Sequence, residues 1–452
     1  MHGVRHELAI VRLVKIILVT HAALAVIAIG WMVIAALRGW ERERRAAEIL
    51  RLHGRVEGPP TLHPVIDGEV CIGSGACVRA CPEDRALVIV NGKGHLAHAS
   101  GCIGHGECLR ACPVEAITLV FGSARRGVDL PEVTPAFESS QPGLYIAGEL
   151  GGMGLIATAV RQGVKAVDAI AASLREAGGD GDDRVLPLLI VGAGPAGIAA
   201  MLSTHERGLR ARWIEKETSL GGAVRSYPRG KVVMTTPVEL PIYGRVHLRR
   251  TTKLALTELW QDVLAAGSIE PEYGITLASI TRDGDTLVAA TTAGPIRARR
   301  VLLATGRRGK PRRLGIEGED LHHVHHHIDD PTEHDGERIL VIGGGDVAIE
   351  TALALAERPR TAVTLCHRGE RIDRARPENQ ERLAAAERDG LLVLRGAQVE
   401  RIAPGVTTIA TAEGTRELEA DRVFVLIGTD LPLDLLTASG IREQTYFGTV
   451  VA

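Results

Sequence analysis

The sequence is short of aromatic residues and of net charge. Phe, Trp and Tyr together make up 3% of its 452 residues, which leaves few rings on which single-stranded bases could stack. The formal net charge is only −2 at pH 7, so the basic surplus that general nucleic-acid binding requires is missing. We therefore expect no nucleic-acid partner. With 45% hydrophobic residues the composition is ordinary for a globular protein, and the length predicts about two to four domains.

One long uncharged run stands near the N-terminus. From Ile16 to Leu37 the sequence has no Asp, Glu, Lys or Arg, and as a helix this run would be about 33 Å long, against a hydrocarbon core of ~30 Å. It exceeds the apolar part of a cleaved signal peptide. We therefore expect residues 1–45 to form a single-pass anchor, with a helix about 16–37, in the cell inner membrane. The rear flank is richer in Arg than the front, which predicts that the bulk of the chain faces the cytoplasm.

Six of the seven cysteines fall in two copies of one motif, Cys-x5-Cys-x3-Cys-Pro. The copies resemble the bacterial two-cluster ferredoxins, whose run is C-x2-C-x2-C-x3-C-P. That resemblance implies a small α+β ferredoxin-like domain over residues 60–122, in which the Cys before each Pro binds the cluster of the other copy. The implied ligand sets are Cys71, Cys77 and Cys112 for one cluster and Cys102, Cys108 and Cys81 for the other.

Both copies depart from the ferredoxin pattern at the second cysteine, where Ser74 and His105 stand instead. Each expected cluster therefore has three thiolates. Three possibilities follow: a three-iron cluster, a four-iron cluster with a Ser or His ligand, or an iron without a protein ligand. Disulfides are disfavoured in a cytoplasmic chain, and zinc sites usually show C-x2-4-C pairs. We expect two iron–sulfur clusters, each 4Fe-4S or 3Fe-4S.

A phosphate-binding turn follows the apolar run Leu188–Val191. The turn reads G-x-G-x-x-G and opens a helical pattern, and such glycines let a pyrophosphate approach the helix N-terminus. Glu215 ends the next predicted strand, where an acid reaches a ribose hydroxyl. The turn residues are Gly192, Gly194, Pro195, Ala196 and Gly197.

A second unit of the same kind begins at Ile339. It is a strand, a G-x-G-x-x-A turn, a helix and a further strand over Ala362–Leu365, with Gly343, Gly345, Asp346 and Ala348 in the turn. His367 and Arg368 follow where an acid would select NADH. Basic residues at this place accommodate a 2′-phosphate, so NADPH is favoured over NADH.

Two such units in tandem resemble the thioredoxin-reductase-like flavoproteins. The resemblance rests also on four shorter signals, Lys216, Gly221–Gly222, Thr305 and Gly306. It implies an α/β fold with two Rossmann-like domains: FAD binding over residues 184–325 and NAD(P) binding over 326–425. Residues 426–452 would return to the FAD domain. The resemblance implies flavin contacts for all four signals.

One piece of that family's pattern is displaced. A strand, a Gly-acid pair and a helix normally follow the NAD(P) domain, and here the pattern occurs upstream. Gly148 and Glu149 follow a short apolar run, and a helical pattern covers Leu155–Ile170. We therefore expect a circularly permuted flavoprotein in which residues 127–178 complete the FAD domain. The acidic stretch Gly178–Asp183 would then connect the positions that are the C-terminus and the N-terminus in other members of that family. The alternative is that Gly143–Ile170 is only a linker helix.

The redox-active C-x-x-C pair of thioredoxin reductases is missing. His326 and Asp329 occupy its places, which excludes dithiol reduction by this chain alone. Five histidines between His322 and His327 are expected to form an exposed loop rather than a metal site. Cys366 is expected to be a small buried residue.

These parts predict an enzyme that passes electrons between NADPH, FAD and iron–sulfur clusters. The combination resembles a ferredoxin:NADP reductase fused to its own ferredoxin. Its electron acceptor or donor is unknown, a membrane-associated one being compatible with the predicted anchor, and a homodimer is compatible with the family. No acid–base residue is assigned. Two alternatives stay open: a flavin-dependent oxidase or monooxygenase with structural clusters, and a non-enzymatic redox sensor.

Overall fold

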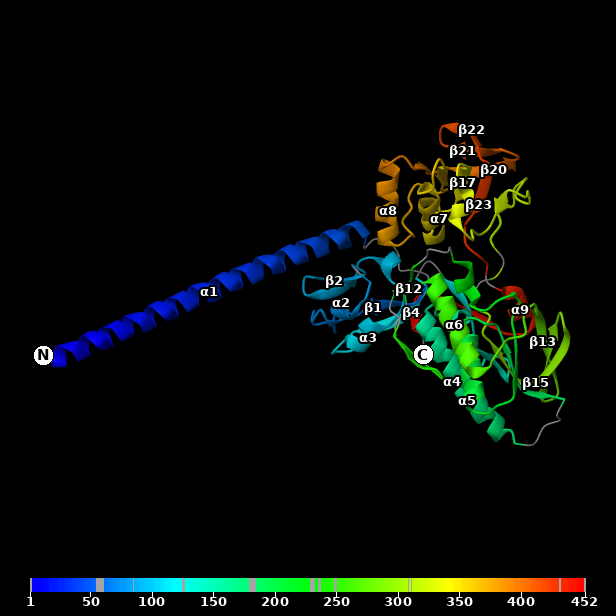
Figure 1. Ribbon diagram of the computed structural model, residues 1–452, viewed down its shortest axis with the longest axis horizontal. Helices are drawn as coiled ribbons and strands as arrows, with labels where there is room; N and C mark the ends of the chain where they lie inside the picture. The colour runs from blue at the N-terminus through cyan, green and yellow to red at the C-terminus, as the bar shows by residue number, and fades with distance from the viewer. Residues whose placement is uncertain are drawn as a thin grey trace. The chain divides into compact units, whose positions relative to one another are not determined.

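The computed structural model forms two units (Figure 1). Unit 1 comprises Met1–Glu57, Pro64–Ala99 and Glu107–Thr118, and unit 2 comprises Gly58–His63, Ser100–Gly106 and Leu119–Ala452. The structure describes residues 2–53, 61–83, 85–123, 127–178, 184–227, 232–234, 237–247, 250–307, 309, 311–430 and 432–450.

Unit 1 contains a long helix and a small domain. The elements are α1 (His2–His53), most of β1 (His63–Ile66), α2 (Ala76–Ala80), β2 (Leu87–Val90), β3 (Lys93–Leu96) and α3 (Glu107–Ala111). Strands β2 and β3 form an antiparallel hairpin. Ala46, Ile49 and Leu50 near the end of α1 pack against the small core of this hairpin. The Glu43 carboxylate also accepts a hydrogen bond from the Asn91 amide at 3.0 Å.

The predicted membrane anchor is not supported. The run Ile16–Leu37 lies within α1, but among the residues that the structure describes no helix combines the length and the apolar character needed to cross a bilayer. The side chains of residues 1–19, 22, 23 and 25 lie outside those described.

The first nucleotide-type domain of unit 2 is built on a six-stranded sheet. Its order is β13-β14-β15-β7-β8, and β6 also pairs with β15 in parallel. Successive residues of β7 face opposite layers: Ile190 packs with the helices and Leu189 with the antiparallel strands and α9. The strands are β6 (Leu144–Ile146), β7 (Leu186–Val191), β8 (Ala211–Ile214), β13 (Leu277–Asp283), β14 (Thr286–Thr291) and β15 (Gly294–Leu303), and the helices are α4 (Ile156–Glu176), α5 (Pro195–Glu206), α6 (Lys253–Gly267) and α9 (Leu433–Ala438).

The second domain of unit 2 has a parallel five-stranded sheet with the order β16-β23-β17-β18-β19. Ile339 and Val341 pack on one face with helices α7 and α8, and Leu340 and Ile342 pack on the other with an antiparallel sheet. The elements are β16 (Val324–His325), β17 (Arg338–Ile342), α7 (Asp346–Ala356), β18 (Ala362–Cys366), α8 (Pro377–Arg388), β19 (Leu392–Leu394), β20 (Gln398–Ala403), β21 (Val406–Thr411), β22 (Gly414–Glu419) and β23 (Arg422–Val425).

The last residues of the chain return to the first of these two domains. Leu436 and Ile441 join the core that contains Ile280, and the Ile280 amide donates to Ser439 Oγ at 3.1 Å. Strand β24 pairs with β5, and β25 pairs with the end of β4. The remaining strands are β4 (Ile117–Phe121), β5 (Val128–Pro131), β9 (Val232–Met234), β10 (Val238–Leu240), β11 (Gly244–Val246), β12 (Arg250–Thr252), β24 (Glu443–Tyr446) and β25 (Thr449–Val450).

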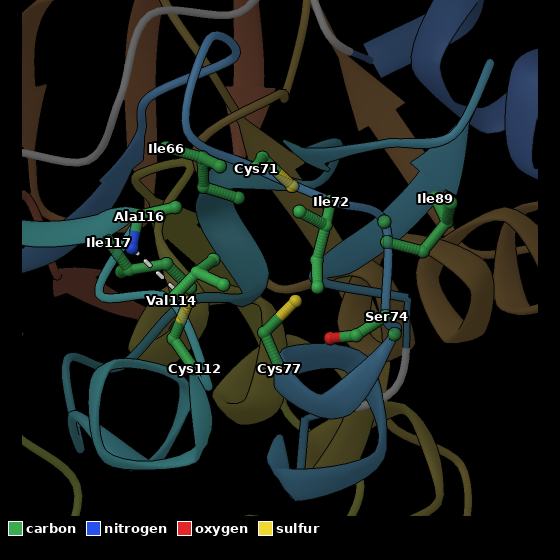
Figure 2. Close-up of a pocket in the computed structure, with 12 residues that line it drawn as sticks. Ile66, Cys71, Ile72, Ser74, Cys77, Ile89, Cys112, Val114, Ala116 and Ile117 are labelled. Carbon is green, nitrogen blue, oxygen red and sulfur yellow. Dashed lines mark hydrogen bonds between the residues drawn. The ribbon is translucent and has the colours of Figure 1, made fainter.

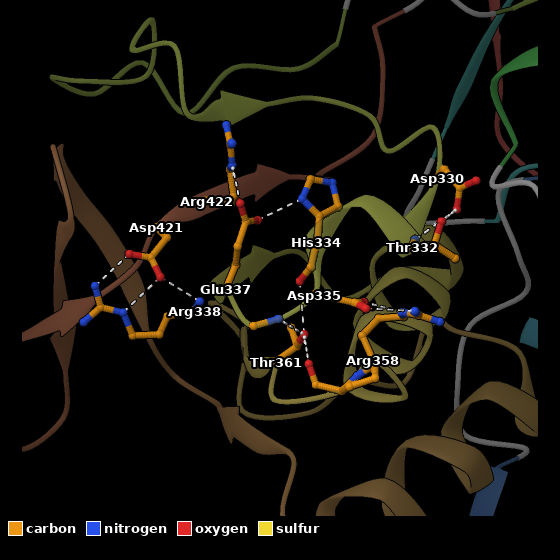
Figure 3. Close-up of polar contacts among 12 residues, drawn as sticks. Asp330, Thr332, His334, Asp335, Glu337, Arg338, Arg358, Thr361, Asp421 and Arg422 are labelled. Atoms are coloured by element: carbon orange, nitrogen blue, oxygen red, sulfur yellow. Dashed lines mark hydrogen bonds and ion pairs between the residues drawn. The ribbon is translucent and has the colours of Figure 1, made fainter.

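Polar contacts tie β17 to its neighbour β23 and to the segment before it (Figure 3). Arg338 donates from Nη2 to Asp421 Oδ1 at 2.7 Å and from its amide to Asp421 Oδ2 at 2.8 Å. The Glu337 carboxylate bridges His334 Nδ1 at 2.9 Å and Arg422 Nε at 3.2 Å. These bonds fix where β17 begins, and therefore where the turn at its far end lies.

Candidate functional site

The turn Gly192–Gly197 is built by close backbone approaches. A Cβ on Gly197 would lie 1.9 Å from the Gly192 carbonyl oxygen, and a Cβ on Gly192 would lie 2.5 Å from the Ala304 carbonyl oxygen. Helix α5 begins at Pro195 with Gly194 as its N-cap and no side-chain cap. Its first amides are therefore available to an anion such as a pyrophosphate.

Glu215 lies against this turn. The residue follows β8, is 5% exposed, and accepts bonds from the amides of Ala193 at 2.5 Å and Glu217 at 2.9 Å. The acid thus stands beside the turn, as predicted for a ribose contact. Lys216, also predicted to bind the cofactor, has a side chain 55% exposed and pairs with Glu217.

Two further predicted segments meet the turn. Gly221 donates from its amide to the Ala193 carbonyl oxygen at 2.8 Å, and a Cβ on Gly222 would be 2.9 Å from the Cα of Gly194. Thr305 follows β15 and lies against Gly192. Its Oγ1 is shielded from solvent and has no hydrogen-bond partner among the described residues. Gly306 has a φ of 69°, so the chain turns sharply after this unsatisfied hydroxyl.

The upstream segment joins the same place. Strand β6, the short apolar run before Gly148, lies in the same sheet as Leu188–Val191, as the predicted permutation requires, because β6 and β7 both pair with β15. Gly148 follows β6 with a φ of 86°, and its Cβ would be 3.0 Å from the Cβ of Ala196. Its amide donates to Gln162 Oε1 of α4 at 2.8 Å. The predicted helix over Leu155–Ile170 is present as α4.

Glu149 has a neighbour that sequence reasoning missed. Arg307 is half-buried; burial lowers the pKa of its guanidinium, and the negative charges of Glu149 and Asp129 oppose that shift. The only sequence signal was the position of Arg307 directly after Thr305-Gly306. All these groups gather at the carboxyl ends of β6, β7 and β15, the edge where open α/β sheets bind ligands. The uncapped helix, the glycine cradle and the unsatisfied Thr305 hydroxyl fit a dinucleotide.

The second turn has the same construction. Helix α7 begins at Asp346 with Gly345 as an uncapped N-cap, and a Cβ on Gly343 would be 2.7 Å from the Cβ of Ala348. Asp346 Oδ1 accepts from the Arg376 amide at 2.8 Å and from Asn379 Nδ2 at 2.7 Å. Because Asp346 is held by the protein, it braces the turn rather than facing outward.

His367 and Arg368 lie beside this second turn. A Cβ on Gly344 would be 2.3 Å from His367 Nδ1, so the imidazole packs directly on the turn. Burial lowers the pKa of His367, and the positive charges of Arg374 and Arg368 lower it further. Arg368 and Arg374 are exposed. This cluster of basic groups fits the 2′-phosphate of NADP.

In unit 1 the structure brings together the first predicted cluster set. Cys71, Cys77 and Cys112 line one pocket with Ser74, and Figure 2 shows their side chains directed toward the same space. Cys112 comes from the second motif copy, as the crossed pattern implies. The wall is otherwise apolar, formed by Ile66, Ile72, Ile89, Val114, Ala116 and Ile117.

Backbone amides point at two of these sulfurs. The Gly94 amide donates to Cys71 Sγ at 3.3 Å, and the Ala116 amide donates to Cys112 Sγ at 3.2 Å. Within the described residues, no group of three His, Cys, Asp or Glu side chains is placed to hold a metal ion. The ligands of one ion must all meet at a single point, whereas a cluster presents a separate iron to each thiolate. The three-sulfur, apolar pocket fits a cluster.

The cysteines of the second predicted set belong to different units: Cys81 and Cys108 to unit 1, and Cys102 to unit 2. Cys108 is 4% exposed; burial raises its pKa to about 11, and the nearby Cys81 and Cys77 raise it too. Cys81 is therefore a neighbour of Cys108, as expected. Cys102 belongs to Ser100–Gly106 of unit 2, and His105 in that segment is half-exposed.

Sequence reasoning missed the residues that shape the first pocket. Lys93 Nζ donates to the Cys71 carbonyl oxygen at 2.7 Å, and a Cβ on Gly73 would be 2.2 Å from the Gly92 carbonyl oxygen. A signal was available in the repeat itself. Gly73 and Gly75 recur as Gly104 and Gly106, and all four have φ between 68° and 76°.

The expectation of an exposed histidine loop is wrong. His323 is 4% exposed, and His325 and His326 are half-buried, because part of the run forms β16, which pairs with β23. His325 lies with its ring centroid 5.5 Å from that of Phe424. Cys366 is buried at 1% exposure, as expected.

Two different protein families match separate parts of the chain. Residues 189–448 match the model of the pyridine nucleotide-disulphide oxidoreductases. This chain belongs to the pyridine nucleotide-disulphide oxidoreductase family. Residues 63–113 match the 4Fe-4S dicluster domain. Members of this oxidoreductase family hold FAD and NADP, so the chain is an NAD(P)H-dependent flavoprotein oxidoreductase with an iron–sulfur domain.

Relatives within the oxidoreductase family cover the flavoprotein part. A ferredoxin–NADP reductase of Ignicoccus hospitalis is 33% identical over 265 residues, 57% of this chain and 81% of the relative. One of Thermus thermophilus is 28% identical over 271 residues, 57% of this chain and 77% of the relative. The bacillithiol disulfide reductase of Staphylococcus aureus has a similar fold, with a TM-score of 0.52 and 21% identity over 57% of this chain and 80% of that structure.

Proposed function

We propose that this enzyme transfers electrons between NADPH and its own iron–sulfur clusters through FAD. The pocket lined by Cys71, Cys77 and Cys112 carries the proposal, because its three thiols fit an iron–sulfur cluster, which would be a one-electron centre in the same chain as the flavoprotein. Bound flavin takes up the two electrons of a hydride and releases them singly, and clusters accept single electrons. Relatives of the flavoprotein part are named ferredoxin–NADP reductases, and here the ferredoxin-like partner is part of the chain.

The protein's own contribution is binding and orientation. The amides at the start of α5 would hold the pyrophosphate of FAD, and Glu215 would accept hydrogen bonds from its ribose. Thr305 Oγ1, which lacks a partner among the described residues, would bond the same cofactor. His367, Arg368 and Arg374 would bind the 2′-phosphate and so select NADPH over NADH. The amides of Gly94 and Ala116 would adjust the reduction potential through their bonds to sulfur.

We infer that the flavoprotein is circularly permuted and that residues 127–178 complete its FAD domain. The pairing of β6 with β15 and the contact of Gly148 with Ala196 support this inference. Helix α9 packs in the core of the same domain, and β24 pairs with β5, so the first and last segments of the permuted flavoprotein lie side by side. The acidic joining stretch lies outside the described residues except for Gly178.

We further propose two clusters, since both motif copies keep three cysteines. In each case the middle cysteine of one copy lies near the last cysteine of the other copy: Cys77 near Cys112, and Cys108 near Cys81. Ser74 and His105 leave each cluster with three thiolates. The second set is Cys102, Cys108 and Cys81.

An anaerobic titration of the full chain with NADPH tests the proposal. We expect the flavin and cluster absorbance to fall together and low-temperature EPR to report reduced clusters. The Cys77→Ala variant should keep its FAD and lose the first cluster, which separates the two signals. Reduction of the flavin with the clusters left oxidised would favour an oxidase or monooxygenase. Negligible turnover with artificial acceptors would favour a redox sensor.

A further inference from the structure

The first cluster pocket has one corner that differs from the other three. Cys71, Cys77 and Cys112 supply sulfur at three places, and Ser74 stands where the ferredoxin run has its remaining cysteine. Cys77 is buried, whereas Ser74 is exposed. The corner without a thiolate is therefore also the corner whose side chain is exposed to solvent.

The backbone fixes Ser74 at that place. Its neighbours Gly73 and Gly75 both have a φ of 68°, and Gly73 touches the Gly92 carbonyl so closely that no side chain fits. The Ser74 hydroxyl accepts one long bond, 3.4 Å from the Ala76 amide. A neutral hydroxyl is a far poorer ligand for iron in a sulfur-rich site than a thiolate.

Positive charge lies beside this corner. Arg79 Nη1 donates to the Ser74 carbonyl oxygen at 3.2 Å and would lie 3.1 Å from a Cβ on Gly75. Lys93 Nζ bonds the Cys71 carbonyl oxygen at 2.7 Å. Two cations at the rim raise the local concentration of anions. We propose that the iron at the Ser74 corner lacks a protein ligand and takes a small anionic thiolate from solution. This inference rests on the iron–sulfur part of the proposed function.

The test uses the reconstituted full chain without oxygen. Mild oxidation with ferricyanide should remove one electron and release Fe²⁺ from that corner, so that about one iron per chain is lost and a three-iron EPR signal appears. Adding Fe²⁺ together with one electron equivalent of dithionite should restore the four-iron cluster. 2-Mercaptoethanol should then change its EPR and Mössbauer spectra at one iron.

Ser74→Cys should abolish both the iron loss and the response to 2-mercaptoethanol, because a fourth thiolate closes the corner. Ser279→Cys, on β13 of unit 2, adds a thiol elsewhere and should behave as wild type. Ser74→Ala keeps the corner open and should respond as wild type does, even if Ser74→Cys fails to fold. A wild-type cluster that ignores 2-mercaptoethanol, or Ser74→Ala spectra unlike the wild type, would overturn the proposal.

Failure of the two proposals is distinguishable. A chain that binds no iron and sulfide contradicts both. A chain whose cluster responds to 2-mercaptoethanol but is not reduced by NADPH contradicts only the proposed electron transfer.

Discussion

Gly148 lies against Ala196, with its hypothetical Cβ 3.0 Å from the Cβ of Ala196. The two residues follow different strands, β6 and β7, which are both paired to β15. Helix α4, which follows Gly148, crosses α5 at Gly163, whose Cβ would be 2.2 Å from the Ala196 carbonyl oxygen. The upstream segment, residues 127–178, therefore helps to hold the turn Gly192–Gly197 in place, because its helix α4 packs against the start of α5.

Gly163→Ala should weaken FAD binding. The added methyl would force α4 away from the start of α5, and overpacking of this kind costs about 1–3 kcal/mol. The expected results are a lower Tm and less FAD retained on gel filtration. Gly151→Ala is the matched control, because nothing lies within 4 Å of its Cβ position. Equal FAD content in both variants would contradict the role given to the α4–α5 contact.

Arg368→Ala should weaken NADPH and spare NADH. Loss of charge-assisted bonds to the 2′-phosphate costs about 1.5–3 kcal/mol, a roughly ten- to hundredfold fall in kcat/KM for NADPH. Flavin reduction followed by stopped flow with each nucleotide measures the two constants. Arg388→Ala, exposed at the end of α8, is the control. Equal losses for both nucleotides would show that Arg368 does not contact the 2′-phosphate.

Gly73→Ala should prevent loading of the first cluster. The residue has a φ of 68° and its Cβ would lie 2.2 Å from the Gly92 carbonyl oxygen, so the loop that carries Cys71 and Ser74 would have to move. Iron and sulfide analysis should show about half of the wild-type content if two clusters are present. Gly68→Ala, with nothing within 4 Å, should keep full content. An unchanged content in Gly73→Ala would mean that the loop does not position the ligands.

His105→Cys should lower the reduction potential of the second cluster. Imidazole in place of thiolate raises the potential of an iron–sulfur centre, so restoring the fourth thiolate should reverse that effect. A redox titration followed by EPR measures it. A potential identical to the wild type would show that His105 does not bind the cluster.

The ion pair Arg338–Asp421 should stabilise the NAD(P) domain at neutral pH and lose this effect in strong acid. Hydrogen bonds from Arg338 lower the pKa of Asp421 to about 2. Since an unfolded Asp titrates near 3.9, the stabilisation is complete above that value and is lost as the pH falls toward 2. Both side chains are 40–45% exposed, so the effect is small. Urea unfolding of wild type and Asp421→Asn should differ at pH 7 and converge near pH 2; a constant difference would contradict the assigned pair.

The sequence by itself determined the chemistry of this protein. The two glycine turns with Glu215 and His367, and the repeated cysteine motif, are short local patterns. Together with the families that these patterns resemble, they were enough to predict a flavoprotein with an iron–sulfur domain. The same local reasoning failed for His322–His327, because pairing of β16 with β23 buries part of the run. The membrane anchor predicted over Ile16–Leu37 is not supported, since no helix of the described residues is both long and apolar enough to cross a bilayer.

Tertiary structure alone decided which distant parts complete each site. The parallel pairing of β6 with β15 sets Gly148 beside Ala196, and the folded domain sets Cys112 beside Cys71 and Cys77. The groups that hold the sulfurs, Gly94 and Ala116, act through backbone amides, and an amide is present at every residue except proline. Their roles come from position in space, because an amide can be aimed at a sulfur only by the packing of the segments around it.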